Sequence, residues 1–228
     1  MTVSLRSKFV LAALTFALAA CANTTPTPMA GVAEASNMQA SSAVTGRISW
    51  VKPGTDFKKY TSVMIAPVSI YDGTDTDWGN TSPSDRTEIA NYLQATYSKA
   101  IGQTLRIVNR PGPNTLLLKM ELVGVQSNVP VAATVSRVYP AGLVANIFNQ
   151  STDKPGTFSG SVTYALSLFD STSNTLLAAA INKKFPEALD VTSTFSTNAA
   201  AKAGIDQGAA QVGKTLQLLR SGQARTGS

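Results

Sequence analysis

Runs of apolar residues with strand-like and helix-like spacing alternate through the centre of the chain. Residues 62–70 read SVMIAPVSI, and this β-branched, mostly apolar run is typical of a strand buried on both faces. Pro67 cannot donate a ladder hydrogen bond, so we expect the strand to lie at a sheet edge or to bulge at this point. Similar patterns predict four more strands, at residues 105–109, 115–126, 159–169 and 175–185.

A helix with clear start and stop signals is predicted between the first two of these strands. Ser82 can cap it, Pro83 suits the first helical position, and Asp85 lies three residues after the cap. Gly102 is a typical helix end. A second helix is predicted at residues 198–220, where the apolar stripe comprises Ile205, Val212, Leu216 and Leu219.

Together these elements predict an α+β fold. The order strand, helix, strand over residues 62–109 is that of a βαβ unit, whose strands are parallel and joined by a right-handed crossover. Residues 159–169 and 175–185 flank a polar turn and predict a C-terminal β-hairpin. We therefore expect a mixed sheet of about five strands, with one βαβ unit and one hairpin, packed by two helices.

The stretch from residue 128 to residue 155 has no clear period. Pro130, Pro140 and Gly142 interrupt its apolar residues, which predicts a partly ordered excursion with a short helix near residues 141–149. Long irregular segments within compact domains are often functional. The apolar side chains are either a partner-binding surface or ordinary core, and the candidates for the surface are Val129, Val135, Val138 and Phe148.

The N-terminus has the pattern of a secretory signal peptide. Arg6 and Lys8 precede an apolar run, residues 9–20, that is too short to span a bilayer. The run ends in Leu18-Ala19-Ala20-Cys21, which resembles the bacterial lipobox. The resemblance implies cleavage between Ala20 and Cys21, a diacylglycerol on the Cys21 sulfur and an acyl chain on the new amine.

Cys21 is the single cysteine of the chain. The alternative is a plain signal peptide with an incidental cysteine, although a lone thiol would be unusual in an oxidising compartment. Three acyl chains exceed the two signals needed for stable anchoring. In enterobacterial lipoproteins an aspartate after the cysteine retains the protein in the inner membrane, so Ala22 favours the outer membrane, with the protein facing the periplasm.

The expected organisation has four parts. Residues 22–46 are rich in Ala, Thr, Ser, Pro and Gly, which predicts a flexible chain with a span of roughly 25–30 Å. The parts are a signal peptide at residues 1–20, an acylated cysteine with a disordered tether at 21–46, a single α+β domain at 47–220 and a disordered tail at 221–228.

Composition limits the function classes. The net charge of +6 falls to +4 once Arg6 and Lys8 are removed, and this mild excess suits a protein beside anionic lipid or glycan. The secretory address argues against nucleic acid as a partner. The chain has no histidine, which removes the commonest general base and a common zinc ligand.

Few residues suggest chemistry. Ser151 and Lys154 have the serine-x-x-lysine spacing of penicillin-recognising enzymes, but Pro155 and Gly156 follow directly and no partner motif accompanies them. One loop contains three aspartates, Asp72, Asp75 and Asp77, but their spacing does not fit a calcium-binding loop. Two lysine pairs, Lys58-Lys59 and Lys183-Lys184, could contact anionic lipid or glycan, but they are more simply explained as solvated edges. We expect no catalytic residue, no metal and no cofactor.

Three motifs resemble a family of bacterial lipoproteins catalogued as domain of unknown function 3313. The motifs run over residues 60–68, 109–116 and 168–178, with Tyr60, Pro111 and Asp170 among them. The resemblance covers most of the chain from Trp50 to Phe185. It implies an envelope lipoprotein with a mixed α+β domain, and it implies no activity.

The sequence therefore predicts an outer-membrane lipoprotein that faces the periplasm and is held by its N-terminal lipid. Its expected role is to bind another envelope component, either a protein or an anionic glycan or lipid. The alternatives are an enzyme acting on cell wall or lipid, and a purely structural envelope protein.

Overall fold

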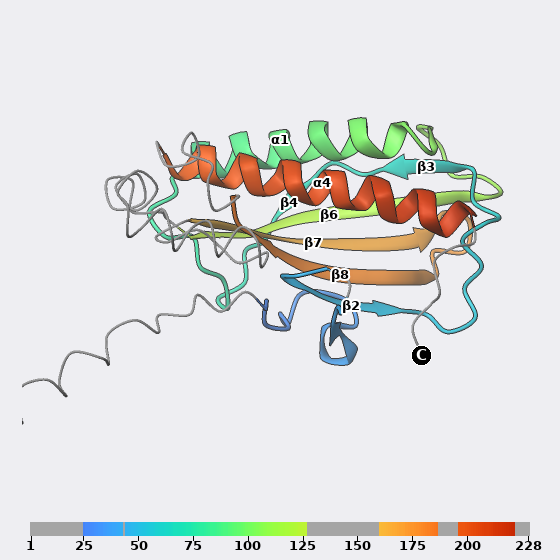
Figure 1. Ribbon diagram of the computed structural model, residues 1–228, viewed down its shortest axis with the longest axis horizontal. Coiled ribbons are helices and arrows are strands. Elements are labelled where there is room, and N and C mark those ends of the chain that lie inside the picture. Colours follow the sequence, from blue (N-terminus) through green and yellow to red (C-terminus); the bar gives the residue numbers. More distant parts are fainter. Residues whose placement is uncertain (1–24, 43, 127–159, 187–195, 222–228) are drawn as a thin grey trace, which may run out of the picture.

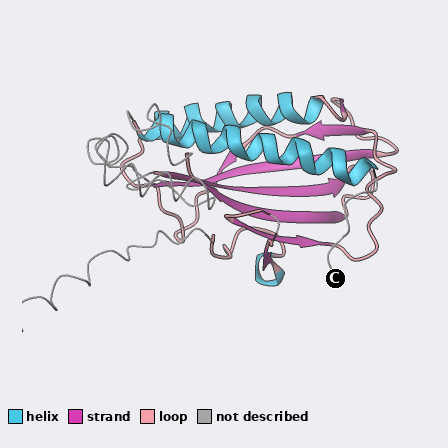
Figure 2. Ribbon diagram, in the orientation of Figure 1, coloured by secondary structure: helices cyan, strands magenta, loops and turns pink. Residues whose placement is uncertain are grey.

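The computed structural model describes residues 25–42, 44–126, 160–186 and 196–221. They form one mixed sheet with two long helices on one of its faces (Figure 1). The strands lie in the order β1-β2-β8-β7-β6-β3-β5, and β4 pairs with β6 beyond the end of β3. Figure 2 shows the same two helices in front of and above most of the strands.

The strands are eight in the described residues: β1 (Gln39–Ala40), β2 (Arg47–Val51), β3 (Ser62–Ile65), β4 (Ser69–Ile70), β5 (Arg106–Ile107), β6 (Thr115–Gln126), β7 (Ser161–Asp170) and β8 (Leu176–Lys184). The helices are α1 (Pro83–Gly102) and α4 (Thr197–Ser221), with a 3-10 turn, η1, at Ala35–Asn37. The predicted α+β class is confirmed, and the sheet has three more strands than the expected five.

The predicted start and end of α1 are confirmed. Ser82 Oγ accepts a 3.2 Å hydrogen bond from Asp85 N, and Asp85 Oδ2 accepts one of 3.3 Å from Ser82 N, so the capping box is complete. The helix ends at Gly102. Its buried face, spaced at helical intervals, comprises Ile89, Ala90, Leu93, Tyr97 and Ile101.

The two helices run parallel, side by side. Near their N-termini, Asn198 Nδ2 donates to Asp85 Oδ1 at 2.7 Å, and near their C-termini a Cβ on Gly213 would lie 3.9 Å from the Ala100 carbonyl oxygen. The close approach of α4 to the sheet depends on glycine. A Cβ on Gly204 would lie 2.9 Å from Val162 Cγ1, and one on Gly208 would overlap the Tyr164 hydroxyl.

The predicted βαβ unit and hairpin are also found. β3 and β5 are parallel, as are β3 and β6, while β7 and β8 pair antiparallel along their length. The predicted strand at residues 62–70 is broken at Pro67 into β3 and β4, and β4 has β6 as its only partner among the described strands. This confirms that Pro67 lies at an edge, because proline lacks the N–H that a ladder requires.

The other face of the sheet is covered by the N-terminal segment, and here the prediction of a disordered tether is wrong. Met29, Val32, Ala35 and Met38 are buried against a cluster from β2, β6, β7 and β8 that includes Ile48, Val123, Ala165 and Ile181. Gln39 and Ala40 then pair with β2. The apolar residues recur every third position, and this period gives them one common face in an otherwise Ala- and Gly-rich stretch.

Tyr71 fastens this segment to the loop after β4. Its hydroxyl donates to Asp75 Oδ1 at 2.6 Å and accepts from Gly31 N at 3.3 Å, while Asp75 Oδ2 accepts from Ala30 N at 3.1 Å. The hydrogen bond from Tyr71 lowers the pKa of Asp75, and the same bond raises the pKa of Tyr71. The chain is therefore held against the domain from residue 30 onward.

Several predicted residues lie outside the described part of the chain: Ala20, Cys21, Val129, Val135, Val138, Phe148, Ser151 and Lys154. The end of the predicted tail, residues 222–228, lies outside it as well. Among the described helices, none is long and apolar enough to cross a membrane.

Candidate functional site

β3 is the last strand but one of the sheet, and it is only partly paired on its outer side, where β5 is its neighbour. It meets β5 at two positions, Ser62 with Arg106 and Val63 with Ile107, and Val108 N donates to the Val63 carbonyl at 2.9 Å. Backbone groups of a strand alternate between its two edges, so Ile65 directs its N–H and C=O outward, beyond the end of β5. Ala66 N, in contrast, donates inward to Leu118 O at 2.9 Å.

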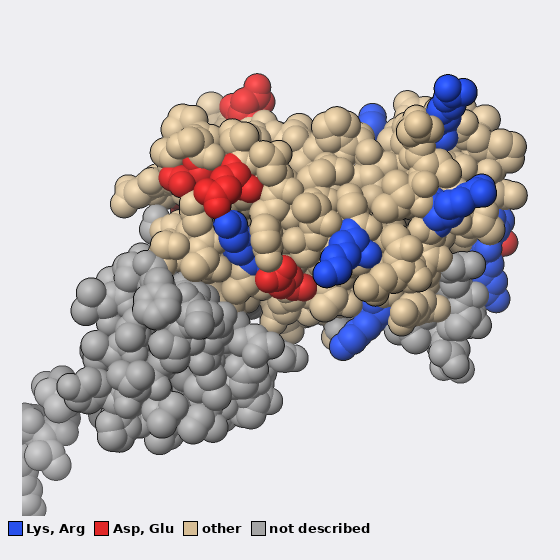
Figure 3. Space-filling model, turned by 90° about the horizontal axis from the view of Figure 1, so that it is seen from above, with Lys and Arg blue, Asp and Glu red and all other residues tan. Residues whose placement is uncertain are grey.

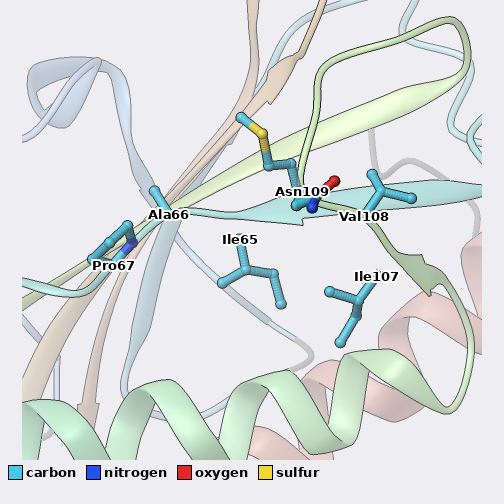
Figure 4. A pocket seen from close by; sticks show the side chains of 7 residues that line it. Ile65, Ala66, Pro67, Ile107, Val108 and Asn109 are labelled. Carbon is cyan, nitrogen blue, oxygen red and sulfur yellow. The ribbon is translucent and has the colours of Figure 1, made fainter.

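A shallow groove lies along this free edge. It has a volume of about 830 Å³ and is lined by Met64, Ile65, Ala66, Pro67, Ile107, Val108 and Asn109. Figure 4 shows Ile65 and Ile107 extending from their strands toward α1. Ile107 is 47% exposed, one of the largest exposures of a bulky apolar residue in the described chain.

A second hollow continues the groove toward α1. Its volume is about 330 Å³, and it shares Ile65 and Pro67 with the first; the other lining residues are Val68, Asn91 and Gln94. Gln94 Oε1 accepts a 2.9 Å hydrogen bond from Val68 N, which fixes the amide at the wall. The groove is thus apolar at its floor, with amide side chains at both ends.

Exposed cations lie next to the groove along the chain. Arg106 and Arg110 are exposed and bracket the lining residues of the β5 side, and Lys99 is exposed in the last turn of α1. In the described part of the chain the one ion pair joins Lys202 and Glu88, at the opposite end of the helices. Seen from the helical side, acidic side chains gather toward one end and basic ones toward the other (Figure 3).

A buried polar cluster lies beneath α4. Tyr97 Oη and Tyr164 Oη are 2.6 Å apart, and Arg47 Nε donates to Asn182 Oδ1 at 2.7 Å. Burial raises the pKa of both tyrosines, that of Tyr164 to about 12, so both phenols stay protonated at neutral pH. A protonated phenol is neither base nor nucleophile, and this cluster serves the packing of α4.

The predicted lysine pairs differ from one another. Lys58 and Lys59 are exposed, and Lys59 lies over the Tyr60 ring at 4.9 Å. The prediction that Lys183 and Lys184 form a solvated edge is wrong for Lys184, which is 2% exposed and whose Nζ donates to the Thr45 carbonyl at 2.8 Å. The N-terminal segment, expected to be disordered, supplies that carbonyl.

The predicted acidic loop has structural partners. Asp75 accepts hydrogen bonds from the Tyr71 hydroxyl and from Ala30 N, as described above. Asp77 accepts hydrogen bonds from Gly79 N at 2.9 Å and from Gln126 Nε2 at 3.2 Å. The described residues contain no group of three or more metal-ligating side chains. These aspartates fix the loop after β4 to the N-terminal segment and to the end of β6.

The groove was missed by sequence reasoning. Pro67 pointed to an edge, but the length of the β3–β5 pairing cannot be read from either segment alone. The one further signal was the shortness of the predicted strand at 105–109; the β5 that forms there pairs with β3 only as far as Val63, so Ile65 has no strand partner on its outer side.

The sequence matches no curated protein. Its fold resembles three solved structures at low identity. A PelC dodecamer from Paraburkholderia phytofirmans is 10% identical over 76% of this chain and 97% of that one, with a TM-score of 0.37. A DUF330-family protein from Xanthomonas campestris is 10% identical over 76% and 91%, with a TM-score of 0.36. A neuraminyllactose-binding hemagglutinin homologue from Helicobacter pylori is 9% identical over 76% and 92%, with a TM-score of 0.36.

None of these structural likenesses indicates a ligand or an assembly for this chain. The family comparison is stronger, because residues 28–212 match the family described as protein of unknown function DUF3313. The match begins within the N-terminal segment that packs on the sheet, so this segment is part of the family's domain. The chain belongs to the DUF3313 family, as its sequence motifs suggested.

Proposed function

We propose that this protein is a lipid-anchored envelope protein, facing the periplasm from the outer membrane, that binds another envelope component through the groove beside β3. The observation that carries the binding role is the exposed, apolar Ile107 next to the unpaired edge at Ile65. Apolar side chains and free backbone groups together are what a peptide-binding edge requires.

The lipobox at Leu18-Ala19-Ala20-Cys21 supports the anchor. The packed N-terminal segment shortens the tether, because Thr25 already lines a hollow with Asp77, Gly124 and Gln126. Three residues lie between Cys21 and Thr25, and the four Cα–Cα steps that join the two span at most about 14 Å when fully extended. The domain would therefore lie close to the membrane rather than at the end of a long flexible chain.

The groove lies far from this anchored end. Ile65 pairs with Leu118, eight residues before Gln126 at the end of β6, which corresponds to roughly 27 Å of strand. A partner could thus reach the groove from the side away from the lipid. The earlier candidates Val129, Val135, Val138 and Phe148 remain a second predicted surface, in the chain between Gln126 and Gly160.

The enzyme alternative gains no support from the titratable groups described. Five described tyrosines have burial or hydrogen-bond partners that raise their pKa values, that of Tyr60 to about 12. The chain has no histidine to act as a base. The pairs Tyr60–Asp170 and Tyr71–Asp75 each have a structural role in holding two segments together.

The anchor is tested by labelling bacteria with a fatty-acid analogue. Wild type should carry the label and Cys21→Ser should carry none, because the thioether needs the sulfur. Equal labelling of the two proteins would contradict lipid anchoring. The binding role is tested by cross-linking in intact cells, where Ile107→Glu should reduce the captured partner and Val51→Glu, with a similar exposure of 44%, should not.

A further inference from the structure

We propose that the groove beside β3 takes an extended acidic peptide segment of a partner protein. The segment adds to the free edge at Ile65, places a bulky apolar side chain against Ile65 and Ile107, and presents carboxylates to Arg106 and Arg110. This rests on the proposed binding function and names the chemistry of its partner.

The backbone of β3 has outward hydrogen-bonding groups with which a peptide can pair. Ile65 has one N–H and one C=O directed outward, past the last β5 pairing at Val63. Pro67, two residues later, lies past the end of β3 and has no N–H to offer. An added strand can therefore make a short ladder here, and the proline prevents it from extending into open-ended association.

The side chains supply the selectivity. Alternate residues of an extended strand point to the same side, about 7 Å apart. The two hollows, of about 830 and 330 Å³, share Ile65 and Pro67, so successive same-side residues of one strand can enter them in turn. The first hollow has the volume for a leucine or phenylalanine side chain, which would cover the exposed Ile107.

The charges favour an acidic partner. Arg106 and Arg110 are exposed and directly precede and follow the lining residues 107–109 in the chain. Arg106 Nη2 donates a 3.3 Å hydrogen bond to Ser62 Oγ. Guanidinium groups without a carboxylate partner in the described chain are complementary to Glu or Asp on a ligand.

A lipid fits this surface less well. An acyl chain would leave the outward backbone groups of Ile65 without hydrogen-bond partners in an apolar contact, which is costly. Pro67 and Asn109 are exposed, so the groove is open along its side and does not enclose a chain. Anionic lipid is therefore the competing occupant that the experiment must exclude.

The test uses the acylated mature protein, which begins at Cys21, in phosphatidylcholine vesicles. The probe is a fluorescein-labelled peptide of alternating Glu and Leu, about eight residues long. Fluorescence anisotropy measures binding, with empty vesicles as background. We expect the peptide to bind, and Ile107→Glu and Arg110→Glu each to weaken it about tenfold. Val51→Glu is the matched control and should leave binding unchanged. Val51 is exposed to a similar degree, but it lies on β2, toward the opposite edge of the sheet.

Two altered peptides separate the contribution of charge to binding from that of backbone pairing. A Lys/Leu peptide of equal length should bind more weakly because its charge is repelled, and a Glu/Leu peptide with N-methylated amides should bind more weakly because it cannot pair with β3. Equal binding of either altered peptide, or an equal loss with Val51→Glu, would overturn the proposal. Displacement of the Glu/Leu peptide by phosphatidylglycerol vesicles would overturn it in favour of lipid.

The same measurement on unacylated Cys21→Ser keeps the two proposals apart. Peptide binding by this variant together with absent fatty-acid label in wild type would contradict the anchor alone. Normal acylation with no peptide binding would contradict the acidic-peptide inference alone.

Discussion

The hydroxyl of Tyr60 donates a 2.9 Å hydrogen bond to Asp170 Oδ2 and so joins the start of β3 to the end of β7. The other carboxylate oxygen, Oδ1, accepts from Thr172 N at 3.0 Å and from Ser173 N at 2.9 Å, and so closes the turn into β8. Tyr60 is 1% exposed. Both residues belong to the motifs through which the family was suspected, and their contact gives those motifs a structural reason.

This contact predicts a particular pH dependence of stability. Hydrogen bonds from Ser173 N and Tyr60 lower the pKa of Asp170 from 3.8 to about 2 in the folded protein. The unfolded state therefore binds this proton more readily, and the stabilisation from Asp170 is complete above about pH 4 and lost as the pH falls toward 2. Urea denaturation should show a gap between wild type and Asp170→Asn at pH 7 that narrows by pH 3. A gap independent of pH would contradict the assignment.

Removing the Tyr60 hydroxyl should destabilise the fold while leaving its core packed. Tyr60→Phe keeps the buried ring and loses one hydrogen bond to a carboxylate, which should cost about 1–2 kcal/mol in the free energy of unfolding. Tyr92→Phe is the control, because the partner of Tyr92, Asp206, is an exposed carboxylate on the surface of α4. A smaller effect for Tyr60→Phe than for Tyr92→Phe would be evidence against the role of the Tyr60–Asp170 pair.

The N-terminal segment should contribute to folding, contrary to the sequence-based expectation that residues 47–220 form the whole domain. Met29 and Val32 are 7% and 6% exposed, and burying each such side chain contributes roughly 1.5–3 kcal/mol. A protein beginning at residue 25 should therefore unfold at higher urea concentration than one beginning at residue 47. Identical midpoints would show that the segment packs without stabilising the domain.

Two glycines of α4 should respond to alanine in opposite directions. A Cβ on Gly208 would overlap the Tyr164 hydroxyl and meet Tyr97 Oη at 2.7 Å, so Gly208→Ala should destabilise by about 1–3 kcal/mol. The nearest atom to a Cβ on Gly213 is 3.9 Å away, so Gly213→Ala should stabilise by up to about 1 kcal/mol through helix propensity. Thermal melting of both variants measures this, and stabilisation by both would mean that α4 lies farther from the sheet.

Neighbouring lysines on β8 offer a similar comparison. Lys184 is buried and its Nζ donates to Thr45 O at 2.8 Å, whereas Lys183 is half-buried with its ammonium 5.7 Å from the Phe185 ring centroid. Lys184→Met should cost about 1–3 kcal/mol, because the Thr45 carbonyl would lose its charged donor. Lys183→Met should cost less, and equal costs in chemical denaturation would contradict the burial of Lys184.

Much of the local structure could be predicted from the sequence. α1 begins at the predicted proline and ends at the predicted glycine, since the capping signals act within a few residues of the chain. β6 spans the predicted residues 115–126, and the hairpin of β7 and β8 follows from two patterned runs joined by a short turn. The resemblance of Leu18-Ala19-Ala20-Cys21 to a lipobox is likewise a local pattern, and lipid attachment there stays a prediction.

Only the tertiary structure decided which strands are neighbours and where pairing stops. The sequence around Met29 and Val32 does not indicate that these side chains pack in one cluster with Ile181, because some 150 residues of chain separate them. The groove has the same origin: Ile65 is free because β5 ends its pairing at Ile107, although each segment alone has the pattern of an ordinary strand. Backbone propensity and capping are set by adjacent residues, whereas a free edge and a covered face depend on distant segments that meet only in the folded chain.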